Sequence, residues 1–110
     1  MRIGLNQKTG HPFILQSQQY QRYEREAVAQ LKPHRPKEPI KTPVSVACVY
    51  YMPTRRRVDL TNLIAATHDI LVKAGILLDD SCDIIYSVDG SRVRYDKAKP
   101  RVEITVRTEE

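Results

Sequence analysis

The sequence predicts a small α/β domain of α+β character, in which two helices pack on a mixed β-sheet of about three to four strands. A chain of 110 residues has room for one hydrophobic core, so residues 1–110 form a single domain. Apolar residues recur first at helical spacing and then in β-branched runs, in the order helix, strand, helix, strand, strand. This order favours a layered α/β fold and argues against a helical bundle or a repeat protein.

The first helix is expected after an irregular N-terminal segment. Residues 1–16 lack a clear period, with a turn expected at residues 8–12 and a short edge strand at 13–15. Ser17 is a suitable N-cap. The helix that follows carries one apolar stripe, formed by Tyr20, Tyr23, Ala27, Val28 and Leu31. We expect the two tyrosines to contribute to the core or to a dimer contact, not to stack on bases.

A proline-rich connector is expected at residues 32–43. Pro33, Pro36, Pro39 and Pro43 exclude a continuous helix, because proline lacks an N–H and clashes with the preceding turn. The segment should therefore be extended and partly polyproline-like. It carries four cations, which either contact phosphates or are solvated: Lys32, Arg35, Lys37 and Lys41.

The remaining elements are better defined. Residues 44–51 are nearly all apolar, as in an internal strand. The next helix has its apolar stripe at Leu60, Leu63, Ile64, Thr67, Ile70, Leu71 and Ala74. Gly75 supplies its C-terminal stop. Two strands are expected at residues 84–88 and 102–108, and a long basic loop should join them.

Charge is distributed unevenly along the chain. Residues 1–58 hold eleven basic and three acidic residues, whereas residues 59–110 hold seven basic and ten acidic ones. A basic half beside an acidic half suits a protein that attracts a polyanion and holds cations near it, although scattered surface charge explains it equally well. No apolar run could span a membrane. Two cysteines without metal-ligand spacing, Cys48 and Cys82, indicate free thiols, buried or half-buried, in a reducing cytoplasm.

Candidate chemistry is concentrated between residues 55 and 80. Arg55, Arg56 and Arg57 lie in a strand-to-helix turn, and guanidinium groups match phosphate oxygens in bidentate geometry. Asp59 follows at the helix start, where a plain N-cap is the alternative role. Asp79 and Asp80 follow the same helix. Carboxylates are suitable Mg²⁺ ligands, but the two groups can meet only if the chain doubles back or a second subunit supplies one.

The helix face opposite the apolar stripe is expected to hold Asp59, Asn62, Ala66, Asp69 and Lys73. Asp69 and Lys73 form an i,i+4 pair, for which a solvated ion pair is the default interpretation. Lys73 is also a candidate DNA contact. In the basic loop, Arg92, Arg94 and Lys97 are second-line DNA contacts, and a solvated hairpin is an equally good interpretation.

The pattern of these residues resembles one known family. The run at residues 53–63, then 69–71, 73–75 and Asp79-Asp80, is similar to the RusA-type Holliday junction resolvases, and more specifically to short, phage-like members. The resemblance covers about residues 44–107. It implies a RusA-like fold and a homodimer in a bacterial or phage-infected cytoplasm. It also implies Mg²⁺-dependent (or Mn²⁺-dependent) paired cleavage of four-way DNA junctions in recombination and repair.

The resemblance also implies roles for individual residues. Asp59 and Asp80 stand at catalytic, metal-binding positions, with help from Asp79, and Thr61, Asn62 and Asp69 support them. Thr61 stands where the family has a second acid, and Ala65 where it has a lysine. The family's first strand and its Pro/Asn-rich loop are expected to be largely missing. A junction-binding protein without nuclease activity, or a small dimeric interaction domain whose acids only cap helices, are the alternatives.

Overall fold

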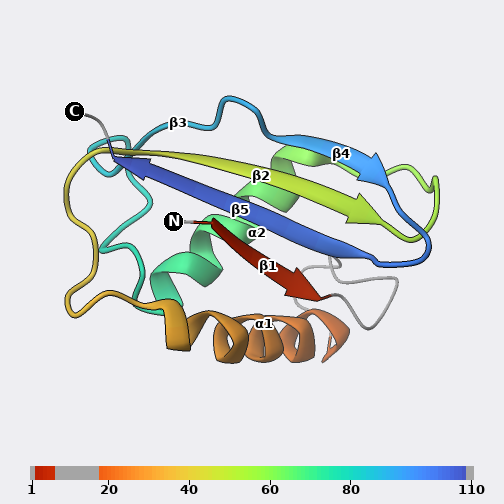
Figure 1. Ribbon diagram of the computed structural model, residues 1–110, viewed down its shortest axis with the longest axis horizontal. Coiled ribbons are helices and arrows are strands. Elements are labelled where there is room, and N and C mark those ends of the chain that lie inside the picture. Colours follow the sequence, from red (N-terminus) through yellow and green to blue (C-terminus); the bar gives the residue numbers. More distant parts are fainter. Residues whose placement is uncertain (1, 7–17, 109–110) are drawn as a thin grey trace.

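Five strands and two α-helices make up the described part of the fold (Figure 1). The structure is a computed structural model that describes residues 2–6 and 18–108. The elements are β1 (Arg2–Asn6), α1 (Gln18–Leu31), the 3₁₀ helix η1 (Lys32–His34), β2 (Val44–Met52), α2 (Leu60–Lys73), β3 (Ile85–Ser87), β4 (Arg92–Tyr95) and β5 (Arg101–Thr108). Within the described ranges no helix is long and apolar enough to cross a membrane.

The strands form one mixed sheet in the order β1-β5-β2-β3. β5 pairs antiparallel with both β1 and β2, whereas β3 and β4 both run parallel to β2. β3 pairs with residues 44–45 of β2 and β4 with residues 49–52, so the two short strands share one edge of β2. Between them, the Cys48 N–H donates to Ser91 Oγ at 3.0 Å. The five described strands thus form one sheet, in which β3 and β4 lie one after the other along the same edge of β2. This confirms the expected mixed sheet.

Two of these strands differ from the sequence-based expectation. β1 lies in the segment expected to be irregular, and β4 lies in the segment expected to be a basic loop. Each is short and is held by a single neighbour, β5 for β1 and β2 for β4, so tertiary pairing decides both. The expectation of a largely missing first strand was therefore wrong. The expected turn at 8–12, strand at 13–15 and Ser17 cap lie outside the described residues.

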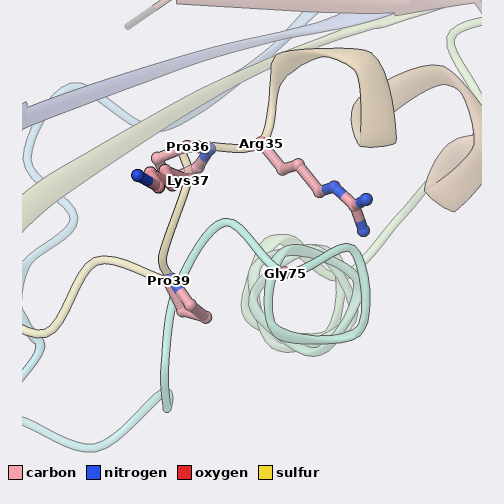
Figure 2. A pocket seen from close by; sticks show the side chains of 5 residues that line it. All are labelled: Arg35, Pro36, Lys37, Pro39 and Gly75. Atoms are coloured by element: carbon pink, nitrogen blue, oxygen red, sulfur yellow. The ribbon is translucent and has the colours of Figure 1, made fainter.

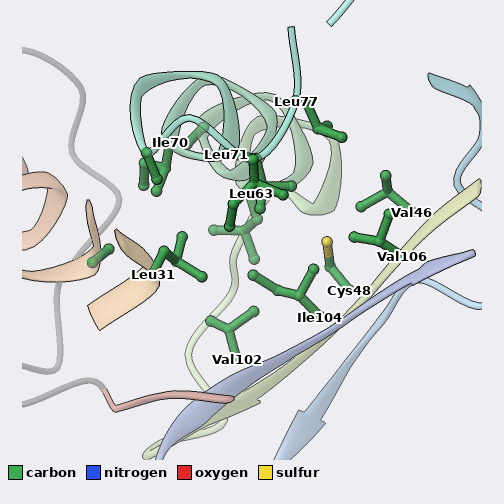
Figure 3. Close-up of a cluster of buried hydrophobic side chains, with 14 of the residues drawn as sticks. Leu31, Val46, Cys48, Leu63, Ile70, Leu71, Leu77, Val102, Ile104 and Val106 are labelled. Carbon is green, nitrogen blue, oxygen red and sulfur yellow. The ribbon is translucent and has the colours of Figure 1, made fainter. Parts of the chain in front are cut away.

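The core lies between one face of the sheet and the two helices (Figure 3). β2 alternates between buried and half-buried positions along its whole length, which shows that only one of its faces is fully covered. The helix α1 contributes four buried residues, Tyr20, Tyr23, Ala27 and Leu31. The expected stripe is confirmed, with Val28 only partly buried against the core. Both tyrosines are core residues.

The helix α2 buries most of its expected stripe, including Leu63, Thr67, Ile70 and Leu71. Ala66, expected on the opposite face, is only 5% exposed. That expectation was wrong because α2 packs against α1 as well as facing the core, which widens its buried sector. Gly75 has a φ of +80° and ends the helix as expected, with its N–H donating to the carbonyl of Val72.

The connector is more regular than a free linker. It begins with the 3₁₀ helix η1 instead of extended chain, which corrects the expectation for residues 32–34. Ile40 then forms a parallel bridge with Leu77, where the Ile40 N–H donates to the Ile76 carbonyl at 2.8 Å. Figure 2 shows a hollow beside it, in which the Arg35 side chain extends past Gly75 at the end of α2. The connector therefore has a fixed course alongside residues 75–78.

The two cysteines lie in different surroundings. Cys48 is fully buried in the core, and burial raises the pKa of its thiol to about 11. Cys82 is exposed, contrary to the expectation of a buried or half-buried thiol, because it lies in the turn before β3. Both thiols are free, as predicted.

Candidate active site

The arginine turn connects the end of β2 to the start of α2. Arg55, Arg56 and Arg57 are all exposed. The Arg55 guanidinium lies 4.5 Å from the ring centroid of Tyr95, a cation–π contact that holds the turn against the end of β4. The turn therefore places three cations close in sequence to Asp59, at the end of the sheet where β2 and β4 both end.

Asp59 is the N-cap of α2. Its Oδ1 accepts hydrogen bonds from the backbone N–H groups of Thr61 at 3.0 Å and Asn62 at 3.3 Å. Asp59 itself is exposed, and its Oδ2 has no hydrogen-bond partner among residues 2–6 and 18–108. Capping thus occupies one carboxylate oxygen and leaves the other facing solvent. The two roles considered from the sequence, helix cap and ligand, are compatible at this residue.

Two substitutions separate these roles. We expect Asp59→Ala to lower the free energy of unfolding by about 1 kcal/mol, because it removes the capping acceptor. Asp59→Asn should change it by only a few tenths of a kcal/mol, since asparagine caps helices about as well as aspartate. Urea unfolding of both variants measures the difference. Equal stability of the two variants would contradict a capping role for this side chain.

The exposed face of α2 holds the other polar candidates. Thr61, Asn62 and Ala65 are exposed near its start. At its end, Lys73 Nζ lies 3.1 Å from Asp69 Oδ2 and 2.9 Å from Glu24 Oε1 of α1, and hydrogen bonds to both carboxylates raise the pKa of Lys73. Lys73 therefore joins α2 to α1 through Glu24, and Asp69 pairs with Lys73 within α2. This contact occupies Lys73, which the sequence had offered as a DNA contact.

His68 is a residue that the sequence-based prediction missed. It lies on α2 one turn after Ala65 and two turns after Thr61, so the three share a face of the helix. Its Nε2 is buried without a hydrogen-bond partner in the described part of the chain. Burial lowers the pKa of its imidazole, and the charge of Asp80 opposes this shift. The spacing from Thr61 and Ala65 was the available signal.

Asp79 and Asp80 follow α2 in an exposed turn. The Asp80 N–H donates to Asp79 Oδ1 at 2.8 Å, which fixes the turn locally. On one side of this pair Leu77 bridges to Ile40, and on the other side the carbonyl of Ile84 accepts from the Val44 N–H at 2.7 Å. The acidic pair is therefore anchored beside the first residue of β2.

Asp59 caps the start of α2, whereas Asp80 follows the end of this helix in the sequence. α2 begins near the Met52 end of β2 and runs back toward the Val44 end (Figure 1). Its 14 residues span about 21 Å. His68, whose imidazole experiences the charge of Asp80, lies nine residues and about 13 Å along the axis from Asp59. Among the described side chains, no three His, Cys, Asp or Glu residues gather as a metal site.

The basic segment after β3 contains exposed cations and one arginine that is held by ion pairs. Arg92 and Arg94 on β4 are exposed, as is Lys97. The Arg101 guanidinium instead binds Asp96 at 2.8 Å and Glu103 at 2.9 Å and lies 3.8 Å from the ring centroid of Tyr51. Arg101 therefore fixes the connection between β4 and β5, and this leaves Arg92 and Arg94 as the cations that β4 offers to solvent.

The comparison with known proteins connects this arrangement to a family. The sequence model of the family described as "Endodeoxyribonuclease RusA" matches residues 2–107, from the first strand through the last. The chain belongs to the RusA endodeoxyribonuclease family. Because the match begins at residue 2, it includes β1, the strand that the sequence-based expectation had counted as largely missing.

Individual relatives of the RusA family match a shorter part of the chain. It is 48% identical over 46 residues to the crossover junction endodeoxyribonuclease rusA of Enterobacteria phage 82. The RusA proteins of Escherichia coli strain K12 and of Shigella sonnei strain Ss046 match at the same identity and length. In each case the match covers 42% of this chain and 38% of the relative. The chain thus spans well under half the length of the curated relatives it matches.

Proposed function

We propose that this chain is a structure-selective endonuclease that cuts four-way DNA junctions by paired hydrolysis of phosphodiester bonds. The observation that carries the proposal is the family match over residues 2–107, together with an exposed carboxylate at the head of an arginine-led helix. The matched relatives are named as crossover junction endodeoxyribonucleases. We place the protein in the cytoplasm of a bacterial or phage-infected cell, in DNA recombination and repair.

The chemistry of the donor set fits a hard divalent cation. Asp59 and Asp80, with Asp79 beside it, offer carboxylate oxygens, which Mg²⁺ and Mn²⁺ prefer, and one or two carboxylates plus substrate phosphate are enough for Mg²⁺. When bound, such a cation supplies polarisation of the scissile phosphate and a lower pKa for the attacking water. Thr61 and Asn62 keep Asp59 in place through their backbone N–H groups.

Cations around the site bind the DNA backbone in this proposal. Arg55, Arg56 and Arg57 contact phosphates beside the scissile bond, and Arg92 and Arg94 extend the contact along β4. Such contacts release counterions and make binding strongly dependent on salt. Lys73 and Asp69 support the site indirectly, because their ion pairs fix α2 against α1. Two copies related by a two-fold axis would nick two opposing strands.

The decisive experiment uses a synthetic four-way junction with and without Mg²⁺ or Mn²⁺. We expect metal-dependent, paired nicks and preference over a linear duplex of the same sequence. Tight junction binding without nicks under either metal would contradict the nuclease and favour a binding protein of the same fold. Equal affinity for the linear duplex would contradict junction selectivity altogether.

The arginine turn gives a second prediction. Replacing Arg56 and Arg57 together by glutamine should weaken junction binding and lower the slope of log K against log salt by about 2, since two phosphate contacts are lost. Arg22→Gln with Arg25→Gln is the matched control, because both lie exposed on α1 and the change in net charge is the same. A salt titration followed by fluorescence anisotropy measures both slopes. Equal slopes for the two double variants would remove the turn from the DNA interface.

A further inference from the structure

The connector beside the end of α2 carries positive charge that the fold itself does not use. An open hollow there, here called the connector hollow, has a volume of about 460 Å³ and is lined by Arg35, Pro36, Lys37, Pro39 and Gly75 (Figure 2). The side chains of Arg35 and Lys37 are exposed and form no hydrogen bond or ion pair within the described part of the chain. Lys73 and Arg101, by contrast, are both held by carboxylates. The connector hollow therefore presents two cations to an external anion.

The backbone of the connector is fixed on both sides of these cations. The Arg35 N–H donates to the Lys32 carbonyl at 3.1 Å, which closes η1. Further along, the Ile40 N–H donates to the Ile76 carbonyl at 2.8 Å. The Ile40 carbonyl accepts from the Leu78 N–H at 2.9 Å. Because the chain is already ordered here, binding of a ligand costs little further loss of backbone entropy.

Capping of α2 does not explain the position of Arg35. A cation near the last turn of a helix can hydrogen-bond to the free carbonyl groups there. Here the carbonyls of residues 70–72 accept from the backbone N–H groups of residues 74–77. The Arg35 Cδ lies 3.8 Å from the position that a Cβ would take on Gly75, and the guanidinium extends past the end of the helix (Figure 2). The aliphatic stem is thus placed beside Gly75, and the charged group is left for a ligand.

The cations of the connector follow the segment that leads to Asp79 and Asp80. The Ile40–Leu77 bridge is parallel, so the connector and residues 75–78 run in the same direction. Lys41, which is also exposed, continues the row of cations beyond the bridge. Arg35 and Lys41 are six residues apart, which is at most about 22 Å of chain. One strand of duplex DNA has a phosphate at about every 3.4 Å of helix axis, so a row of this length can contact several phosphates.

We propose that the connector hollow binds backbone phosphates of DNA, with Arg35 and Lys37 as the contacts. Arg35 offers a planar fork that matches two phosphate oxygens, and Lys37 adds a compact charge. A polyanion fits better than a small phosphate compound, because the hollow is open and exposed cations continue on both sides of it at Lys32 and Lys41. The inference rests on the proposed function for the identity of the DNA. It gives the acidic end of α2 a DNA contact separate from the arginine turn, which precedes the start of this helix.

The salt dependence of junction binding tests the connector hollow. Arg35→Gln with Lys37→Gln should reduce the slope of log K against log salt by about 2, since two phosphate contacts are lost. Arg35→Lys with Lys37→Arg keeps both charges and should keep the wild-type slope. Arg22→Gln with Arg25→Gln removes the same charge from the exposed surface of α1 and should keep it as well. Fluorescence anisotropy in EDTA measures binding without cleavage, and circular dichroism verifies folding.

Removal of the neighbouring acid gives a second test, whose expected gain of affinity cannot come from loss of folding. Glu38 is exposed and is the one acid among residues 32–43, which hold four Lys or Arg residues. Glu38→Gln should strengthen junction binding by about two- to fivefold at low salt, because a negative charge within a Debye length of the phosphates is removed. Glu26→Gln makes the same change on α1 and should have a smaller effect. An affinity of Glu38→Gln equal to that of wild type would contradict a DNA path along the connector.

The connector hollow and the proposed function can fail separately. A chain that nicks the junction, but whose Arg35→Gln, Lys37→Gln variant keeps the wild-type slope, would overturn the connector hollow and retain the nuclease. A chain that never nicks, but whose slope falls in this variant, would overturn the nuclease and retain the connector hollow as a DNA site. A chain with no measurable affinity for DNA would overturn both.

Discussion

Asp80→Asn should lower the rate of junction cleavage by at least about 100-fold while leaving junction affinity within about threefold of wild type. The change removes one negative charge and one ligand oxygen but keeps the shape of the side chain. Mutation of residues that only hydrogen-bond to the ligands of a metal typically lowers metal affinity or activity by about 10–100-fold. Loss of a direct ligand should lower the cleavage rate at least as much. The arginine turn is unaltered, and the affinity that depends on phosphate contacts should persist. Single-turnover cleavage and fluorescence anisotropy on the same junction measure the two effects.

Asp83→Asn is the matched control for this change. Asp83 lies three residues further along, is also exposed, and loses the same charge when it is replaced. The Asp83→Asn variant should cut the junction at close to the wild-type rate, because we expect the reaction to depend on Asp80 itself and not on the total negative charge near it. If both variants slow cleavage equally, Asp80 is one charge among several and not a specific ligand. If Asp80→Asn cleaves normally, the assignment of Asp80 to the site is wrong.

The sequence was sufficient for the core elements and insufficient for the edges of the sheet. The apolar periods of α2 and β5 are long, so burial of residues such as Leu71 and Ile104 could be predicted directly. β1 and β4 have five and four residues, and their conformation depends on neighbours that are remote in sequence. Local pattern does not contain that information. Ala66 was misplaced for a similar reason, since its burial follows from tertiary packing, which brings α1 against α2, and not from the period of α2 itself.

The candidate site shows the same division. The chemical character of Asp59 and of the arginine turn followed from residue types and spacing, and the capping geometry agrees with it. The relation between Asp59 and Asp80 did not follow, because it depends on the path of the chain after Gly75. The Ile40–Leu77 bridge directs this path toward the start of β2, and nothing in the local sequence predicts that bridge. His68 was overlooked because a single histidine in a helix forms no motif by itself, and only its spacing from Thr61 and Ala65 places it on their face of α2.

Leu71→Ala should lower the free energy of unfolding by about 2–5 kcal/mol, because it leaves a cavity in the core. Leu71 is fully buried on α2, and its backbone carbonyl accepts from the N–H groups of Ile76 and Leu77 as the chain leaves the helix. The residue therefore lies where the core meets the segment leading to Asp79 and Asp80. A small domain has only about 5–15 kcal/mol of net stability, so the loss would be a large fraction of the total.

Leu60→Ala makes the same chemical change in the first turn of α2, where the side chain is only partly buried. It should cost clearly less than Leu71→Ala, because fewer contacts are lost and the cavity can fill with water or collapse. Urea unfolding at one fixed protein concentration compares the two variants, so that any self-association would affect both measurements equally. If Leu60→Ala costs as much as Leu71→Ala, the packing of α2 against the sheet is not organised around Leu71. If only Leu71→Ala lowers the stability, we expect the Leu71→Ala variant also to cut DNA more slowly than wild type at temperatures at which it is still folded. The reason is that the segment carrying Asp79 and Asp80 follows the end of the same helix.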